Sequence, residues 1–107
     1  MAIKIINETI SEENIRNEYN TMRDIQDCEY LVKIENIPIL NFNFERKNYN
    51  AFFMELCDKS LLDLIKEKTD TNSQVEFTDI FNWSKEIFLG LVYLHEKRLL
   101  HRDIKPG

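Results

Sequence analysis

The sequence predicts an α+β fold in two parts, a strand-rich first half and a helical second half. Short segments with β-branched or alternating apolar residues occupy residues 2–6, 40–45 and 51–54, which is typical of strands. From residue 60 onwards, apolar residues recur at helical spacing instead. Glycine and proline each occur only twice among 107 residues, so the chain has too few tight turns for a many-stranded sandwich or barrel. We expect the two parts to join near residues 55–59.

A helix is predicted to follow the first strand. Ser11 is a typical N-cap, and acidic residues come directly after it, where the positive end of the helix dipole favours them. Apolar side chains then share one face of the helix: Ile15, Tyr19, Met22 and Ile25. Glu18 lies three residues after Ile15 and four before Met22, so it lies on that apolar face. This is an unusual place for a carboxylate.

A β-hairpin is predicted next. Leu40, Phe42 and Phe44 alternate with polar residues, which is the pattern of a half-buried strand. Residues 46–49 have the composition of a polar turn, and residues 51–54 that of an antiparallel partner strand.

Two helices are predicted in the second half. A short helix is expected after Ser60, and a polar loop at residues 70–74 separates it from a long helix that Thr78 caps. Apolar residues of the long helix cover more than one face: Ile80, Phe81, Ile87, Phe88, Leu91, Val92 and Leu94. We therefore expect this helix to be buried on more than one side.

Charge and cysteine content limit the kinds of partner. The formal net charge is −5, and lysine and arginine are scattered among acidic residues, so we expect no nucleic-acid partner. Cys28 and Cys57 form no CxxC pair and lie far from both histidines in the sequence, which argues against a zinc site. Because no apolar run is long enough for a secretory signal or a membrane span, we expect no membrane partner and an intracellular, cytoplasmic location, with the nucleus left open.

The final seven residues carry the strongest functional signal: His101-Arg102-Asp103-Ile104-Lys105-Pro106-Gly107. They resemble the catalytic loop of the eukaryotic protein kinase family, H-R-D-L/I-K-P-x-N, at six positions, and a predicted helix precedes them as that motif requires. The alternative is a polar turn in which Asp103 is only a capping carboxylate. The residues just before the loop, Tyr93-Leu94-His95-Glu96 and Leu99-Leu100, also resemble the family's approach from the helix to the loop, which counts against that alternative.

The resemblance implies an incomplete, two-lobed protein-kinase-like fold. Residues 1–54 would be part of the small β-rich lobe, residues 55–59 the hinge, and residues 60–107 the first helices of the large lobe. Asp103 would accept or orient the proton of the substrate hydroxyl, and Lys105 would neutralise charge on the transferred phosphoryl group. A lysine followed by proline at this place resembles the serine/threonine kinases, so hydroxyls of a protein substrate are implied as acceptors.

Two stretches in the first half also match the family. Ala2-Ile3-Lys4 resembles the V-A-I-K segment of the family's third strand, where Ala2 would line the adenine pocket and Lys4 would contact the α- and β-phosphates. Glu18 resembles the helix glutamate that pairs with this lysine. The alternatives are an ordinary lysine at a strand end and an exposed helical acid, with Glu13 as a competing candidate. The place of Glu18 on the apolar face favours Glu18.

Residues 52–58 resemble the family's fifth strand and hinge. Met54 would be the gatekeeper behind the adenine. The backbone carbonyl of Glu55 and the backbone amide and carbonyl of Cys57 would hydrogen-bond to the adenine edge. Because backbone groups would make these hydrogen bonds, the identity of the side chains gives only weak support for a hinge. The alternative is an ordinary buried strand.

The resemblance implies ATP and Mg²⁺ as cofactors, with the metal ligands expected outside this chain. The family's asparagine would follow Gly107, its D-F-G aspartate would come later, and its glycine-rich loop would precede Met1. The sequence is therefore interpreted as a fragment of a kinase domain that is inactive alone. Its long apolar helix would lack partners and expose an apolar patch, so we expect poor solubility.

Two other functions stay open at this point. A truncated kinase-like scaffold or regulator would bind a partner without catalysis. The intact residues Lys4, Glu18, Asp103 and Lys105 count against a degenerate kinase of that type. A helical interaction module with chance motif matches is the third interpretation. The kinase subfamily, the protein substrate and the oligomeric state do not follow from the sequence.

Overall fold

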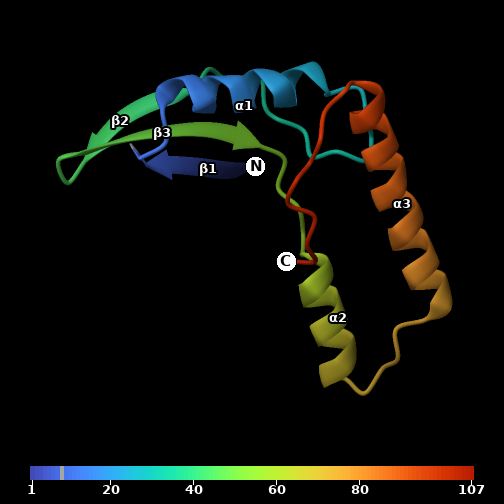
Figure 1. Ribbon diagram of the computed structural model, residues 1–107. Helices are drawn as coiled ribbons and strands as arrows, with labels where there is room; N and C mark the ends of the chain where they lie inside the picture. Colours follow the sequence, from blue (N-terminus) through green and yellow to red (C-terminus); the bar gives the residue numbers. More distant parts are fainter. Residues whose placement is uncertain (8) are drawn as a thin grey trace. The chain divides into compact units, whose positions relative to one another are not determined.

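The computed structural model describes residues 1–7 and 9–107, and the chain forms two compact units (Figure 1). The first unit comprises residues 1–56 and the second residues 57–107. The first contains a three-stranded sheet and a helix, and the second contains two helices. The predicted α+β class is therefore confirmed. The division between the units falls within residues 55–59, whose role as a hinge stays a prediction.

In the first unit a helix lies along one face of an antiparallel sheet (Figure 1). The elements are β1 (Ala2–Asn7), α1 (Glu12–Asp24), β2 (Leu40–Phe44) and β3 (Lys47–Met54). The strand order is β1-β3-β2, so β3 is central. The connection that contains α1 therefore carries the chain from one edge of the sheet to the other.

The core of the first unit is formed by α1 and β3. Phe52 on β3 and Ile15 on α1 are 0% and 1% exposed. Tyr19 meets the Phe52 ring edge-on, with 6.0 Å between the ring centroids, and its hydroxyl donates a hydrogen bond to the carbonyl of Ile37 at 3.0 Å. The polar end of this buried tyrosine is thereby satisfied. The buried cluster also includes Ile6 and Ile34.

α1 begins and packs as the sequence predicts. The side-chain oxygen of Ser11 accepts a hydrogen bond from the backbone N–H of Asn14 at 3.2 Å, which satisfies one of the free donors at the helix start. Ile15, Tyr19 and Ile25 are buried. The predicted N-cap and the predicted apolar face are therefore both confirmed.

The hairpin turn is shorter than the sequence predicts. The turn consists of Glu45 and Arg46, whose φ angles of 47° and 64° are both left-handed, as a two-residue hairpin turn of type I′ requires. The predicted turn at residues 46–49 was wrong because β3 already begins at Lys47 and pairs in register with β2 from there. The polar residues of this stretch instead form cross-strand pairs; the Asn43 side-chain amide, for example, donates to the side-chain oxygen of Asn48 at 2.9 Å.

The second unit contains α2 (Leu61–Asp70) and α3 (Phe77–Glu96). A capping box starts α2: the Ser60 side chain accepts from the backbone N–H of Asp63 at 3.1 Å, and the Asp63 carboxylate accepts from the backbone N–H of Ser60 at 3.2 Å. The prediction that Thr78 caps α3 was wrong. The N-cap is Glu76, which makes no side-chain capping bond, and its carbonyl accepts from Ile80 at 3.2 Å. Thr78 already lies inside the first turn.

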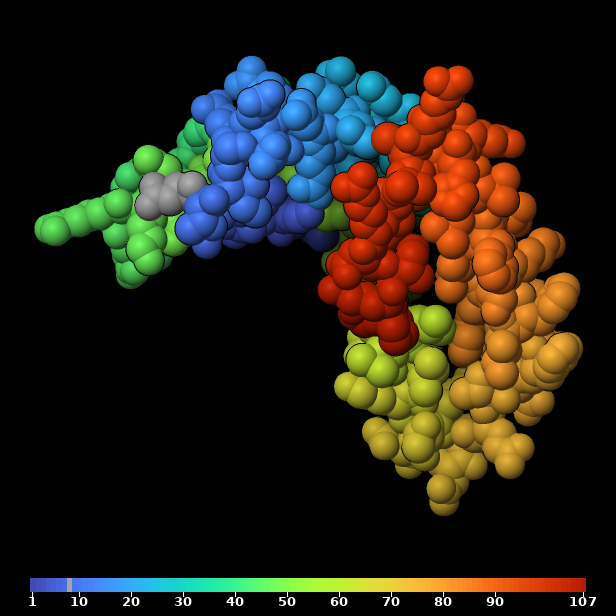
Figure 2. All heavy atoms as spheres, viewed as in Figure 1, coloured from blue at the N-terminus to red at the C-terminus, as the bar shows by residue number. Residues whose placement is uncertain are grey.

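Most apolar side chains of α3 are exposed. Phe77, Phe81 and Phe88 are 77%, 60% and 65% exposed, and Figure 2 shows the orange atoms of α3 at the surface. Buried positions on this helix are Gly90 and Leu94. The predicted burial on more than one side was wrong, because the described part of this unit offers only α2 and connecting segments as packing partners. The predicted exposed apolar patch is present.

The scarcity of glycine forces other residues into left-handed backbone conformations. Among the described residues, five that are not glycine have positive φ. Arg98 (φ 60°) ends α3 in a Schellman motif. Its N–H donates to the carbonyl of His95, and the N–H of Leu99 donates to that of Leu94, both at 2.9 Å. Asn72 (φ 52°) ends α2 in the same way. Each of these positions is one that glycine would occupy with less strain.

Replacing Arg98 by glycine is expected to stabilise the second unit. A left-handed conformation costs an L-residue about 1–2 kcal/mol, whereas glycine adds about 0.5–1 kcal/mol of unfolded-state entropy, so we expect a net gain of up to about 1 kcal/mol. Glu96→Gly, within the last helical turn, is the matched control and should cost about 1 kcal/mol. Urea unfolding followed by circular dichroism measures both. A destabilised Arg98→Gly variant would contradict the assigned strain.

The stability of the second unit should fall in acid through Asp79. A hydrogen bond from the Lys68 side chain lowers the pKa of the Asp79 carboxyl below its ordinary value, and the charge of Lys68 adds to this effect. A lowered folded-state pKa stabilises the protein above the unfolded pKa of about 4, and the contribution disappears as the pH falls through the folded-state value. We expect the difference in melting temperature between the parent and Asp79→Asn to be small at pH 6 and to shrink as the pH falls below about 4. Lys68→Met should reduce the difference at pH 6, because the hydrogen bond from Lys68 is the largest cause of the lowered pKa; a difference that does not change with pH would contradict this cause.

Candidate nucleotide-binding and catalytic residues

Lys4 and Glu18 form an ion pair in the first unit. β1 places Lys4 opposite Phe52 on β3, and the Lys4 Nζ lies 5.7 Å from the centre of the Phe52 ring. Nζ forms a salt bridge with Oε1 of Glu18 on α1. Both side chains are about two-fifths exposed, at 43% and 41%. A pair this exposed contributes only about 0–1 kcal/mol to stability, so its main effect is to fix the position of the ammonium group.

The salt bridge distinguishes between Glu18 and Glu13, the two candidate partners of Lys4. Glu18 holds Lys4, whereas Glu13 lies exposed one turn earlier on α1. The apolar-face position of Glu18 was the signal in the sequence, since it directs this side chain towards the sheet rather than towards water.

Ala2 and Met54 lie beside this pair. They are opposite each other in the β1–β3 register, two positions from Lys4 and Phe52. Because side chains alternate between the two faces of a strand, Ala2, Lys4 and Met54 share one face of the sheet. Met54 is partly buried and packs against the core cluster. The structure therefore places Ala2 and Met54 next to the pair formed by Lys4 and Glu18.

Glu55 is fixed by Lys33, a residue that the sequence did not single out. The backbone N–H of Glu55 donates to the Lys33 carbonyl at 2.8 Å, and the backbone N–H of Lys33 donates to the Glu55 carboxylate at 3.1 Å. The Lys33 Nζ also donates to the carbonyls of Gln26 and Cys28. This leaves the Glu55 carbonyl, the group predicted to accept from adenine, without a backbone hydrogen bond among the described residues. Cys57 is exposed and its thiol is free.

The candidate catalytic loop, residues 101–107, lies in the second unit and is exposed. The Lys105 Nζ lies 3.1 Å from Oδ2 of Asp103, and these side chains are 61% and 72% exposed. The backbone N–H of Asp103 donates to Nδ1 of His101 at 3.3 Å. A carboxylate next to an ammonium can accept a proton while the ammonium offsets negative charge on a substrate. Both groups are accessible from solvent.

The end of the loop is tied to the start of α2. The Pro106 carbonyl accepts from the backbone N–H of Leu62 at 2.7 Å. This amide is one of the donors that a helix N-terminus leaves without an intrahelical partner. A Cβ on Gly107 would lie 2.9 Å from Cδ2 of Leu62, so the chain approaches this side chain too closely for a larger residue to fit without a shift. Sequence reasoning did not find this contact.

The described residues contain no group of three or more metal-ligating side chains, so none of them is assigned to Mg²⁺. In the same part of the chain, no helix has the length and apolar character to cross a lipid bilayer.

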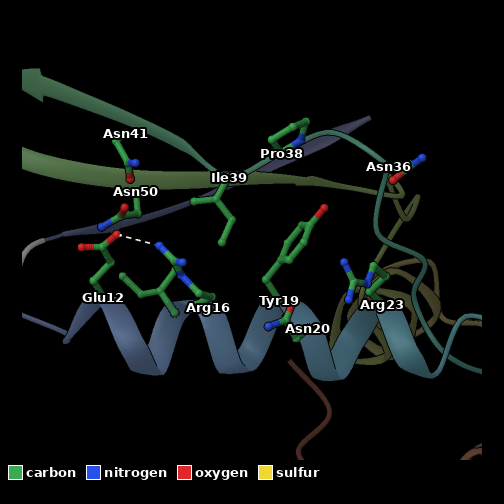
Figure 3. A pocket seen from close by; sticks show the side chains of 11 residues that line it. Glu12, Arg16, Tyr19, Asn20, Arg23, Asn36, Pro38, Ile39, Asn41 and Asn50 are labelled. Atoms are coloured by element: carbon green, nitrogen blue, oxygen red, sulfur yellow. Dashed lines mark hydrogen bonds and ion pairs between the residues drawn. The ribbon is translucent and has the colours of Figure 1, made fainter.

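The first unit also contains a cavity of about 450 Å³ away from these residues (Figure 3). Its walls are residues of α1, of the segment that leads into β2, and of β2 and β3 themselves: Glu12, Ile15, Arg16, Tyr19, Asn20, Arg23, Asn36, Pro38, Ile39, Asn41 and Asn50. Two of these residues form a salt bridge, with 3.0 Å between Nη2 of Arg16 and Oε1 of Glu12. None of the residues predicted to bind nucleotide is in this lining. We therefore do not assign the cavity to ATP.

The chain is similar to known proteins along its whole length. The protein kinase domain family matches residues 1–107. Serine/threonine-protein kinase dst4 of Dictyostelium discoideum is 34% identical over 110 aligned residues, which cover 100% of this chain and 21% of that protein. Eukaryotic translation initiation factor 2-alpha kinase pek-1 of Caenorhabditis elegans is 33% identical over 92% of this chain and 7% of its own length. Serine/threonine-protein kinase Nek3 of Mus musculus is 32% identical over 92% of this chain and 20% of its own length. The chain thus spans about a fifth or less of these curated relatives.

Proposed function

The chain belongs to the protein kinase family, and on that premise we propose that it forms part of a domain that transfers a phosphoryl group from ATP to serine or threonine hydroxyls of a protein substrate. The observation that carries this proposal is the ion pair between Lys4 Nζ and Glu18 Oε1. Phosphoryl transfer depends on positioning and on charge neutralisation. A lysine held in place by a glutamate supplies both for the phosphates of a nucleotide.

Residues within 2–57 would bind the nucleotide. Lys4 would contact the α- and β-phosphates, and Glu18 would keep its ammonium group in place. Ala2 and Met54 would contact the adenine ring from the same sheet face. The Glu55 carbonyl and the backbone amide and carbonyl of Cys57 would bind the adenine edge. The free Glu55 carbonyl and the shared face of Ala2, Lys4 and Met54 support this assignment.

The residues of the second unit would act on the protein substrate. Asp103 would orient the attacking hydroxyl and accept its proton, and Lys105 would offset the charge that grows on the phosphoryl oxygens. Mg²⁺, when bound, neutralises the phosphate charge further, and we expect its ligands outside residues 1–107. A cytoplasmic location, without a nucleic-acid or membrane partner, belongs to the same proposal.

Nucleotide binding by the full chain tests the role of Lys4. We expect Lys4→Met to weaken ATP affinity, measured by calorimetry, by at least about tenfold, or 1.4 kcal/mol. Lys47→Met is the matched control: it removes the same charge from the opposite face of the same sheet and should leave the affinity unchanged. Equal affinities for the parent and both variants would overturn the proposed nucleotide site.

Transfer assays separate catalysis from binding. We expect residues 1–107 alone to bind ATP without transferring radiolabelled phosphate, because the described residues contain no group of three or more side chains that could hold Mg²⁺. Turnover that disappears in Asp103→Asn would overturn this expectation and support the role of Asp103. Binding of another protein without phosphoryl transfer, in a longer protein that contains residues 1–107, would favour the scaffold or regulator instead.

A further inference from the structure

We propose that β2 is a self-association edge, through which two copies of this chain join their sheets into one. This inference goes beyond the phosphotransfer function and does not depend on it. It begins from the strand order β1-β3-β2, which leaves one side of β2 unpaired within the described residues. Edge strands are usually protected by a charge, a proline or a bulge. β2, Leu-Asn-Phe-Asn-Phe, contains none of these, and all five of its residues are exposed.

The turn geometry shows which backbone groups of β2 face outwards. Phe44 and Lys47 flank the two-residue turn and are paired with each other, so they form the pair that exchanges both backbone hydrogen bonds. Since such pairs alternate along an antiparallel ladder, the N–H and C=O groups of Asn41 and Asn43 point away from β3. Outside the sheet, neither residue makes a backbone hydrogen bond among the residues that the structure describes.

The alternation of apolar residues and asparagines in β2 is symmetric about Phe42, which suits antiparallel pairing with a second copy. In an antiparallel pair centred there, Asn41 of each copy lies opposite Asn43 of the other, and the outward groups of both form hydrogen bonds. Leu40 lies opposite Phe44, and Phe42 lies opposite itself. Apolar residues therefore meet apolar residues on one face and asparagines meet asparagines on the other. Such a contact is isologous and closes as a dimer.

The apolar face of this edge would gain most from pairing. Leu40, Phe42 and Phe44 are 46%, 41% and 60% exposed. Phe42 is already stacked on Tyr49 of β3, with 5.5 Å between the ring centroids and 18° between the planes. In this dimer the two Phe42 residues would form a non-hydrogen-bonded pair, the kind of cross-strand pair in which the side chains are closest. Aromatic pairs at such positions are favourable. No charged side chain of β2 opposes the contact.

The other edge strand is not suited to the same pairing. β1 contains Lys4, and antiparallel pairing centred on Lys4 would place two ammonium groups opposite each other, which is unfavourable. Centring the pair on Ile5 would instead place Lys4 against Ile6 and Ile3 against Asn7. The symmetric pattern is therefore specific to β2.

Sedimentation equilibrium of the full chain tests the proposal. We expect a monomer–dimer equilibrium that Phe42→Lys weakens at least about tenfold, because it places like charges at the dyad. Asn43→Pro should weaken it as well, since it removes an outward N–H without removing a backbone hydrogen bond to β3. Ile5→Lys is the matched control: it makes the same kind of change at an exposed residue (59%) on the same sheet face, and it should leave the dimer intact. Circular dichroism checks that each variant is folded.

Cross-linking gives a second test that does not depend on stability. In a Cys57→Ser background, Phe42→Cys should form a disulfide-linked dimer under mild oxidation, and Ile5→Cys should not. A parent chain that stays monomeric, an equal effect of Ile5→Lys and Phe42→Lys, or cross-linking by Ile5→Cys alone would overturn the proposal.

Discussion

Phe52→Ala is expected to destabilise the first unit strongly. Phe52 is fully buried on the central strand and contacts Tyr19 edge-on. Deleting a buried phenylalanine ring removes its transfer free energy and leaves a cavity, which together cost about 3–5 kcal/mol. Small domains are stable by only about 5–15 kcal/mol, so this loss is a large share of the total. Urea unfolding followed by circular dichroism measures it.

Phe88→Ala is the matched control for this loss. It makes the same chemical change at a phenylalanine that is 65% exposed on α3, and we expect an effect within about 0.5 kcal/mol. A Phe52→Ala variant that loses less than about 1 kcal/mol would contradict the assignment of Phe52 to the centre of the core.

Ile15→Asp is expected to be the most damaging single change in α1. Ile15 is 1% exposed, and a carboxylate at this position would be buried without a partner. We expect a loss of more than about 4 kcal/mol, or a first unit that does not fold. The loss should be smaller in acid, where the carboxyl is protonated, and a pH series of unfolding curves checks this.

Asn14→Asp is the matched control for Ile15→Asp, because it adds the same negative charge at the neighbouring residue. Asn14 is exposed in the first turn of α1, three residues after the Ser11 cap, where a negative charge is stabilised by the helix dipole. We expect a neutral or slightly stabilising effect. Equal losses from Asn14→Asp and Ile15→Asp would show that added charge, and not burial, destabilises the helix.

Features set by neighbouring residues could be predicted from the sequence. Ser11 precedes acidic residues and an apolar periodicity, so the start and the buried face of α1 follow from local chemistry. The turn at Glu45 and Arg46 could not be predicted in this way. Asparagines favour turns, but here Asn48 and Asn50 pair with Asn43 and Asn41 across the sheet. Pairing with β2 overrides the local preference.

The candidate site shows the same limit. Glu18 could be predicted because a carboxylate on an apolar helix face is unusual, and the resemblance supplied Lys4 as its partner. The bonds that join Lys33 to Glu55 and Leu62 to Pro106 connect residues far apart in the sequence. No periodicity or motif marks such contacts, because they depend on how segments meet after folding.

The hydrogen bond from the Leu62 amide to the Pro106 carbonyl also allows movement of the candidate catalytic loop to be followed at α2. The Leu62 amide is protected by the Pro106 carbonyl, whereas the next amide, that of Asp63, is protected by the Ser60 side chain within the same helix start. Solvent hydrogen can therefore replace the Leu62 proton only when the end of the loop leaves α2. The exchange rate of this single amide, compared with that of Asp63, reports how often the loop departs while the helix itself stays formed.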